Sequence, residues 1–114
     1  MKKITIKEII KKKGIKPICC LTSYTSSVTK IIDKYCDIIL VGDSLGMVLY
    51  GMKTTRDVKL ETMIVHAKAV KNSAKQSLVV VDMPYKTYTN KFKAFKNAKK
   101  IINSTKCDAV KLEG

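Results

Sequence analysis

Apolar and polar positions along the chain predict strands that each end at an acid. The run Ile38–Val41 is entirely apolar and stops abruptly at a Gly-Asp-Ser turn. A short apolar run bounded by turn residues is typical of a strand buried on both faces. The same pattern recurs twice further along the chain, and the acids that end the three runs are Asp43, Asp82 and Glu113. In parallel α/β folds, the carboxyl end of a strand is where binding and catalytic groups gather.

Helical periodicity between these runs predicts the remaining elements. Thr5 and Glu8 have the spacing of a capping box, and Ser26 or Ser27 and then Asn90 are candidate caps of later helices. We expect helices over residues 6–13, 26–35, 60–73 and 91–104, strands over 18–21, 37–41, 77–81 and 109–112, and a loop over 42–51. The apolar stripes expected on the second and fourth helices are Val28, Ile31, Ile32 and Tyr35, and Phe92, Phe95, Ala98 and Ile102.

The order of the predicted elements fixes the expected fold class. Helices and strands alternate along the whole chain, which implies right-handed βαβ units and a parallel sheet. A length of 114 residues allows one domain with its own core. We therefore expect a single α/β domain that consists of a short first helix, three βα units and a fourth strand.

Composition narrows the classes of function. The net charge is +14, but every basic residue except Arg56 is a lysine, and the lysines are spread along the chain. Proteins that read nucleic acid cluster their basic residues and use arginine for paired contacts, so specific nucleic-acid binding is not expected. No apolar run reaches the length of about 20 residues that spans a bilayer. The four cysteines lack zinc-ligand spacing, which favours reduced thiols in a cytoplasmic protein.

Candidate chemistry lies at the strand ends. Side-chain alternation places Lys111 on the same side of its strand as Glu113, and a lysine there needs an acid or an anionic ligand as partner. Carboxylates at neighbouring strand ends could hold Mg²⁺, and Ser44 could bind an anionic group. The alternative is structural, because strand-end acids often cap helices or bind loop amides. His66, the only histidine, is expected to pack or lie at the surface rather than act as a base.

Three motifs with matching order and spacing resemble the ketopantoate hydroxymethyltransferase family, also called 3-methyl-2-oxobutanoate hydroxymethyltransferases. They read VGDSLGM at residues 41–47, DMPY at 82–85 and VKLEG at 110–114. The likeness extends from about Thr5 to the last residue and includes the helix that carries His66. It implies that this chain is the N-terminal half of a (β/α)₈ barrel from an enzyme that forms homo-oligomers.

The resemblance also implies a reaction and a binding site. The family transfers a hydroxymethyl group from 5,10-methylenetetrahydrofolate to 2-oxoisovalerate with the help of Mg²⁺, in the pathway to pantothenate. By resemblance, Asp43, Asp82 and Glu113 are expected to surround the metal ion. Asp43, Ser44, Asp82 and Lys111 are expected to form the binding site of the oxo-acid.

Two departures from the family pattern affect these expectations. Thr25 stands where the family usually has an aspartate, which could alter the loop that contains it. The family's general base, a glutamate, is expected beyond residue 114, so we assign no catalytic base in this chain and expect the isolated chain to be inactive. The chain could be a fragment, a truncated product or one half of an enzyme that a second polypeptide completes. Two alternatives stay open: another Mg²⁺–enolate barrel of the phosphoenolpyruvate mutase and isocitrate lyase kind, or a non-catalytic basic binding protein.

Overall fold

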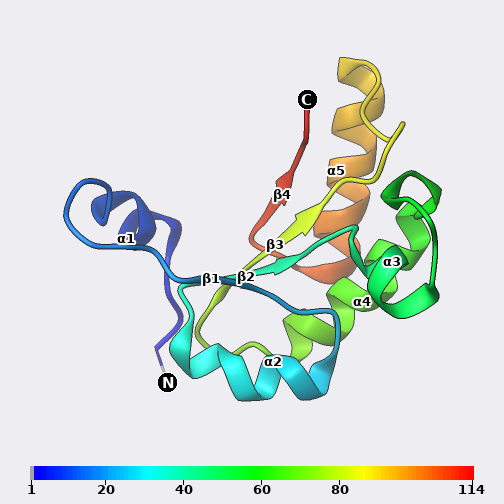
Figure 1. Cartoon of the computed structure of the whole chain (residues 1–114). Helices are drawn as coiled ribbons and strands as arrows, with labels where there is room; N and C mark the ends of the chain where they lie inside the picture. The colour runs from blue at the N-terminus through cyan, green and yellow to red at the C-terminus, as the bar shows by residue number, and fades with distance from the viewer. Residues whose placement is uncertain (1) are drawn as a thin grey trace.

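The computed structural model describes residues 2–114 and contains alternating helices and strands (Figure 1). Their order confirms the expected α/β class. The α-helices are α1 (Ile6–Lys11), α2 (Ser26–Ile32), α3 (Leu45–Tyr50), α4 (Leu60–Ser73) and α5 (Lys91–Thr105). The strands are β1 (Cys20–Thr22), β2 (Ile38–Val41), β3 (Leu78–Asp82) and β4 (Ala109–Lys111), and two 3₁₀ turns, η1 (Asp33–Tyr35) and η2 (Thr55–Asp57), complete the elements.

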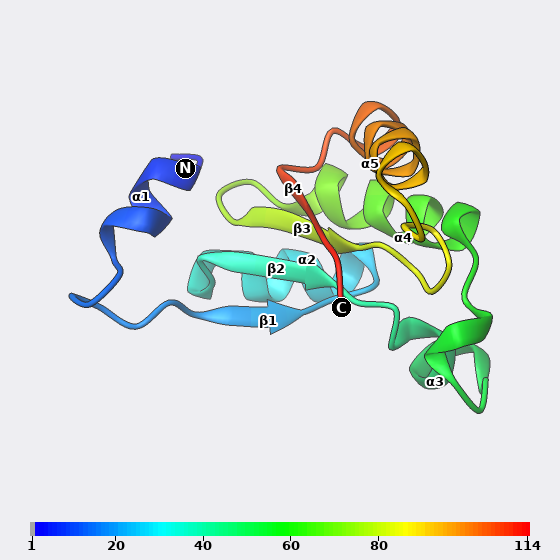
Figure 2. The same cartoon turned by 90° about the horizontal axis from the view of Figure 1, so that it is seen from above.

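The four strands form one parallel sheet in the order β1-β2-β3-β4, as the alternation predicts. Each strand therefore pairs with the next strand in the sequence, and all four carboxyl ends lie at one edge. Helix α1 lies beyond the amino ends of the strands and α3 beyond their carboxyl ends (Figure 2). The amino ends and the carboxyl ends of the strands therefore lie in different surroundings, the first near α1 and the second near α3.

Helices α2, α4 and α5 lie on one face of the sheet (Figures 1 and 2). Ile39 and Val41 of β2 and Val79 and Val81 of β3 face this layer and are completely buried. The alternate β2 side chains are only half-buried, so the expectation of burial on both faces is wrong for this strand. In this chain helices cover only one face of the sheet, and the alternation of side chains leaves every second residue on the other face.

Polar side chains cap the first turns of α1, α2 and α5. Thr5 and Glu8 form the predicted capping box of α1, and Asn90 accepts a hydrogen bond from a backbone N–H of α5 as expected. Helix α2 is capped by Thr25, whose hydroxyl accepts from the Val28 N–H at 3.3 Å, rather than by Ser26 or Ser27. Threonine and aspartate are both good cap residues, so Thr25 can hold this helix start without an acid.

The expected loop over residues 42–51 contains helix α3, so that prediction is wrong. Gly51 ends the helix with φ +66°, a left-handed conformation that glycine adopts without strain. Gly46 lies inside the helix, where an added Cβ would stand 2.4 Å from Val58 Cγ2 and 2.9 Å from Met52 Sδ. Close packing against the segment that follows therefore requires glycine at position 46.

Two predicted apolar stripes are mostly exposed in this chain, which corrects the burial expected for α2 and α5. Val28, Ile31 and Tyr35 are exposed, while Thr29 of α2 is completely buried. Burial of Thr29 is possible because its hydroxyl bonds the Thr25 carbonyl oxygen at 2.7 Å and Ser23 Oγ at 2.9 Å. In α5, Ile101 and Thr105 turn inward and the predicted stripe is largely exposed, with Phe92, Phe95 and Ile102 exposed and Ala98 half-buried.

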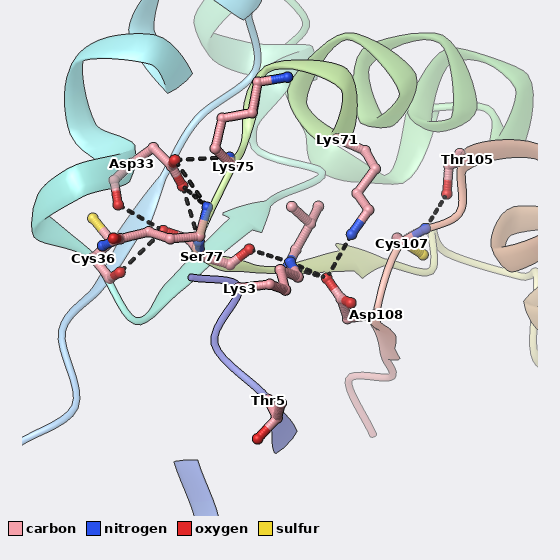
Figure 3. A network of polar contacts seen from close by, with 12 residues as sticks. Lys3, Thr5, Asp33, Cys36, Lys71, Lys75, Ser77, Thr105, Cys107 and Asp108 are labelled. Carbon is pink, nitrogen blue, oxygen red and sulfur yellow. Dashed lines mark hydrogen bonds and ion pairs between the residues drawn. The ribbon is translucent and has the colours of Figure 1, made fainter. Parts of the chain in front are cut away.

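Acids close the amino end of the sheet through backbone hydrogen bonds (Figure 3). Asp33, just after α2, is 4% exposed and accepts from the backbone N–H groups of Lys75, Gln76 and Ser77 at 2.7–3.1 Å. Asp108, just before β4, accepts from the Val79 N–H at 2.8 Å. Its carboxylate also binds the ammonium groups of Lys3 and Lys71, both at 3.0 Å. These contacts tie the N-terminal segment, α4 and β4 to β3.

None of the helices in residues 2–114 is both long and apolar enough to cross a membrane. The four cysteines are free thiols, with Cys36 and Cys107 buried and Cys19 and Cys20 exposed. Burial raises the pKa of Cys36 to about 11, which keeps this thiol protonated and unreactive at neutral pH.

Candidate active site

Lys111 and Asp82 form the centre of the cluster at the carboxyl end of the sheet. They are register partners on β4 and β3, so their side chains emerge on the same face. Lys111 Nζ donates to Asp82 Oδ1 at 3.1 Å and also to the Glu113 carboxylate. The hydrogen bond to Glu113 raises the pKa of Lys111. Partial burial alone would lower this pKa, but the hydrogen bond to Asp82 and the charge of Asp82 also raise it. The prediction that Lys111 meets an acid is confirmed, and its side chain is cationic at neutral pH.

Asp43 lies beside this pair but is bound differently. Its backbone N–H donates to Asp82 Oδ2 at 3.0 Å, which positions the β2 turn against β3. Among residues 2–114, the Asp43 carboxylate forms no ion pair. Burial raises the pKa of Asp43, and the nearby charges of Asp82 and Glu113 raise it further. The cluster therefore contains a carboxylate whose charge is not neutralised within the described residues, a state that favours binding of a cation.

Ser44 occupies the residue before α3, yet its side chain does not cap that helix. Its Oγ lies 2.6 Å from the hydroxyl of Tyr24, which comes from the loop after β1. Gly42 approaches closely on the same turn, since a Cβ there would stand 3.1 Å from Ser44 Oγ and 3.5 Å from Asp82 Oδ2. The two loops after β1 and β2 thus meet at the Ser44 hydroxyl.

A cavity of about 250 Å³ opens over this edge of the sheet. Asp43, Asp82 and Glu113 all line it, so the three predicted acids share one cavity. The other lining residues are Thr55, Arg56, Met83, Tyr85, Tyr88 and Gly114. Sequence reasoning missed Thr55 and Arg56 in this lining, and it also missed Tyr24 beside Ser44. Tyr24 could have been found from its place after a strand, but the polar segment before α4 gives no comparable signal.

The residues of the cluster fit a divalent cation in part. Residues 2–114 contain no group of three or more His, Cys, Asp or Glu side chains arranged to hold a metal ion. The Lys111 ammonium lies between Asp82 and Glu113 and partly neutralises both. Mg²⁺, however, needs only one or two carboxylates and keeps several waters. Asp43 and Asp82 could supply that number of carboxylates, although Asp82, like Glu113, also binds Lys111.

Together the fold and the cluster define an α/β protein in which three acids line a cavity at the carboxyl edge of a parallel sheet, with a lysine and a serine close to these acids. Such an edge is the usual place for a small-molecule site. A family model described as Ketopantoate hydroxymethyltransferase matches residues 3–114. The chain belongs to this family of transferases, and the resemblance seen in its motifs is confirmed.

Curated relatives agree with the family model. A 3-methyl-2-oxobutanoate hydroxymethyltransferase from Pelagibacter ubique is 54% identical over 109 residues, which cover 96% of this chain and 42% of that protein. The protein of the same name from Rhizobium etli is 54% identical over 114 residues, with 99% and 42% covered. The one from Anaplasma marginale strain Florida is 50% identical over 111 residues, with 97% and 40% covered. The chain thus spans about two fifths of the length of these relatives.

Proposed function

We propose that this chain forms the N-terminal portion of a 3-methyl-2-oxobutanoate hydroxymethyltransferase. The enzyme transfers a hydroxymethyl group from 5,10-methylenetetrahydrofolate to 2-oxoisovalerate and yields 2-dehydropantoate for pantothenate and coenzyme A synthesis. The observation that carries this proposal is the cavity lined by Asp43, Asp82 and Glu113, together with the Lys111 ammonium that binds two of these acids, Asp82 and Glu113. The names of the relatives support the choice of reaction.

The side chains of the cluster suit an oxo-acid substrate. Lys111 supplies a fixed positive charge near the point where negative charge develops on the keto oxygen when carbon C3 loses its proton. The hydroxyl of Ser44 can donate a hydrogen bond to an anionic end of the substrate. Asp43 and Asp82 would hold Mg²⁺, which when bound polarises a carbonyl group as a Lewis acid. Asp82 additionally orients both the Lys111 ammonium and the Asp43 backbone, so it fixes the geometry of the site.

The same proposal covers the parts of the enzyme outside these residues. The four parallel strands are four of the eight of a (β/α)₈ barrel, with their carboxyl ends at its catalytic face. The rest of the barrel and the base that removes the C3 proton come from sequence outside these 114 residues. The complete enzyme is a cytoplasmic homo-oligomer. The share of the relatives that the chain covers supports this division.

A chimeric enzyme tests the proposal. The chain replaces the matching segment of the Pelagibacter ubique relative, and formation of 2-dehydropantoate is measured with Mg²⁺ and the folate co-substrate. We expect an active chimera in which Asp82→Asn lowers kcat/KM by about 100-fold or more, because a preorganised charged group is removed. Asp37→Asn is the matched control, since Asp37 binds Lys12 at the opposite end of the sheet.

We expect the Asp37→Asn chimera to keep activity within about threefold of the unsubstituted chimera, because its carboxylate is far from the proposed reaction. A folded chimera without activity would contradict the proposed function. Equal activity of the Asp82→Asn and unsubstituted chimeras would contradict the site assignment.

A further inference from the structure

His66 connects three segments beside the cluster, although it does not line the cavity. It lies in the middle of α4 and is half-buried. Its Nδ1 is 2.8 Å from the backbone carbonyl oxygen of Tyr24, and its Nε2 is 2.7 Å from the hydroxyl of Tyr50 on α3. The Tyr50 and His66 rings also meet edge to face, with centroids 5.7 Å apart. One imidazole thus holds the loop after β1 and the helix after β2 against α4.

The chemistry of these partners determines the direction of each hydrogen bond. A backbone carbonyl oxygen only accepts, so His66 Nδ1 carries the proton and donates to Tyr24. In the neutral ring Nε2 is then the acceptor, and the Tyr50 hydroxyl donates to it. Both nitrogens are therefore used in structural contacts, and neither is available to remove a proton from a substrate.

The contact with Tyr24 extends to the proposed substrate site. The Tyr24 hydroxyl pairs with Ser44 Oγ at 2.6 Å, so the position of the Tyr24 backbone determines where its hydroxyl meets Ser44. If Tyr24 donates in this pair, the Ser44 proton remains free to point at a ligand. No helix-capping bond competes for Ser44, because its side chain does not cap α3.

We propose that His66 is a positioning residue that anchors the Tyr24 backbone, so that the Tyr24 hydroxyl orients Ser44 toward an anionic oxo-acid. This inference rests on the proposed function of the Ser44 site. The contact that matters is the Nδ1–H bond to Tyr24, whereas the bond to Tyr50 only secures α3. His66 acts through Tyr24 and Ser44 and has no direct contact with substrate.

Two isosteric substitutions separate the two bonds of His66. In His66→Asn, the side-chain amide nitrogen takes the place of Nδ1 and keeps a donor for Tyr24. In His66→Gln, the amide reaches the place of Nε2 and keeps a partner for Tyr50 only. His66→Ala removes both bonds, and Tyr24→Phe removes the link to Ser44 while keeping the Tyr24 carbonyl. Tyr35→Phe is the matched control, because Tyr35 is an exposed tyrosine at the end of η1, the 3₁₀ turn that follows α2.

The experiment measures binding of 3-methyl-2-oxobutanoate with Mg²⁺ to the chimeric enzyme described above, with and without each of these substitutions, by titration calorimetry. One lost hydrogen bond between neutral groups corresponds to about a 3- to 10-fold loss of affinity. We expect this loss in His66→Ala, His66→Gln and Tyr24→Phe, and affinity within about twofold of the unsubstituted chimera in His66→Asn and Tyr35→Phe. Imidazole ¹⁵N shifts of His66 in the unsubstituted chimera are expected to show the Nδ1–H tautomer.

The outcomes distinguish this inference from the proposed function. A folded, unsubstituted chimera that binds no oxo-acid would overturn the proposed function, and the inference with it. Binding in the unsubstituted chimera with equal affinity in the folded His66→Ala chimera would overturn only the role of His66. A His66→Gln variant that binds better than His66→Asn, or an Nε2–H tautomer, would also overturn it, because both would place the important bond at Tyr50.

Discussion

The two ends of the sheet carry similar residues in different states. At the amino end, the carboxylates of Asp33, Asp37 and Asp108 all accept hydrogen bonds from backbone N–H groups, and two of them also bind lysines. At the carboxyl end, Asp43 has no ion pair within residues 2–114, and burial raises its pKa. Acids that the main chain satisfies hold the fold together, whereas an acid without a partner remains available to a ligand.

The size of a cavity does not show which end of the sheet is the binding site. A larger hollow, about 470 Å³, lies beside α1 at the amino end and is lined by Ile4, Glu8, Lys11, Lys12, Ile15, Lys16 and Asp37. Its acids are already bound, because Asp37 pairs with Lys12 and Glu8 caps α1. The cavity over Asp43 and Asp82 is smaller, but its polar groups converge. Convergent polar groups are a better indication of a binding site than volume alone.

The largest expected effect is on stability, at the amino end. Asp33→Ala removes the acceptor of three backbone N–H groups, those of Lys75, Gln76 and the buried Ser77. A buried N–H group left without an acceptor costs about 1–3 kcal/mol, and the other two groups lose a hydrogen bond. We expect the free energy of unfolding, measured in urea, to fall by about 3 kcal/mol. Asp43→Ala is the paired variant at the carboxyl end, and we expect its stability to stay within about 1 kcal/mol of wild type. Equal losses in the two variants would remove the distinction between the ends.

Acid pH is also expected to weaken the contacts at the amino end of the sheet. Burial alone would raise the pKa of Asp33 and Asp108, but hydrogen bonds outweigh it and hold both pKa values below their usual range. These bonds come from backbone N–H groups in both cases, and for Asp108 also from the lysines Lys3 and Lys71. A carboxyl group with a lowered native pKa stabilises the fold above its unfolded value of about 3.9, and this contribution is lost as the pH falls through the native pKa. We expect stability in urea to decrease between pH 5 and pH 2.

The variant Asp33→Asn should lose less stability over that pH interval, because it lacks one of the carboxyl groups whose native pKa is lowered. An equal decrease in the variant and the wild-type chain would show that Asp33 is not responsible. The comparison needs only the unfolding free energies of both proteins at the two pH values, with Asp108 present in each.

A smaller effect is expected for lysines at the two ends. Lys71→Met removes one of two ammonium groups from Asp108, and partly buried pairs of this kind contribute about 1 kcal/mol. Lys111→Met should lower the unfolding free energy by no more than this, about 1 kcal/mol, since Glu113 is exposed and the buried Asp82 carboxylate keeps its hydrogen bond from the Asp43 N–H. If the loss in Lys111→Met exceeded that in Lys71→Met, Lys111 would be structural rather than a ligand-binding residue.

The sequence predicted the carboxyl end better than the amino end. Apolar runs that stop at turns located Asp43, Asp82 and Glu113, and side-chain alternation placed Lys111 on the face of an acid, because both signals are local. The role of Asp33 depends on backbone groups more than 40 residues away, which no local pattern contains. Asp33 also lies within residues 26–35, which were expected to form an ordinary amphipathic helix.

Helix positions were predicted more reliably than helix surroundings. The bounds of α4 were found because its apolar side is regular, while α3 was missed because its six residues are too few to show a period. The exposed stripe on α2 shows a further limit, since apolar periodicity identifies a helix without saying which face this chain buries. Two contacts of His66 were unpredictable for the same reason as those of Asp33, because they join distant loops.

The most direct test of the difference between the two ends is where a divalent cation binds. Mn²⁺, a paramagnetic substitute for Mg²⁺, is added to the ¹⁵N-labelled chain with 3-methyl-2-oxobutanoate, and broadening of each backbone amide signal is measured. The account predicts selective broadening at Asp43, Ser44 and Asp82, with little change at Asp33 and Asp108. Broadening centred on the amino-end acids, or none at the carboxyl end, would contradict it.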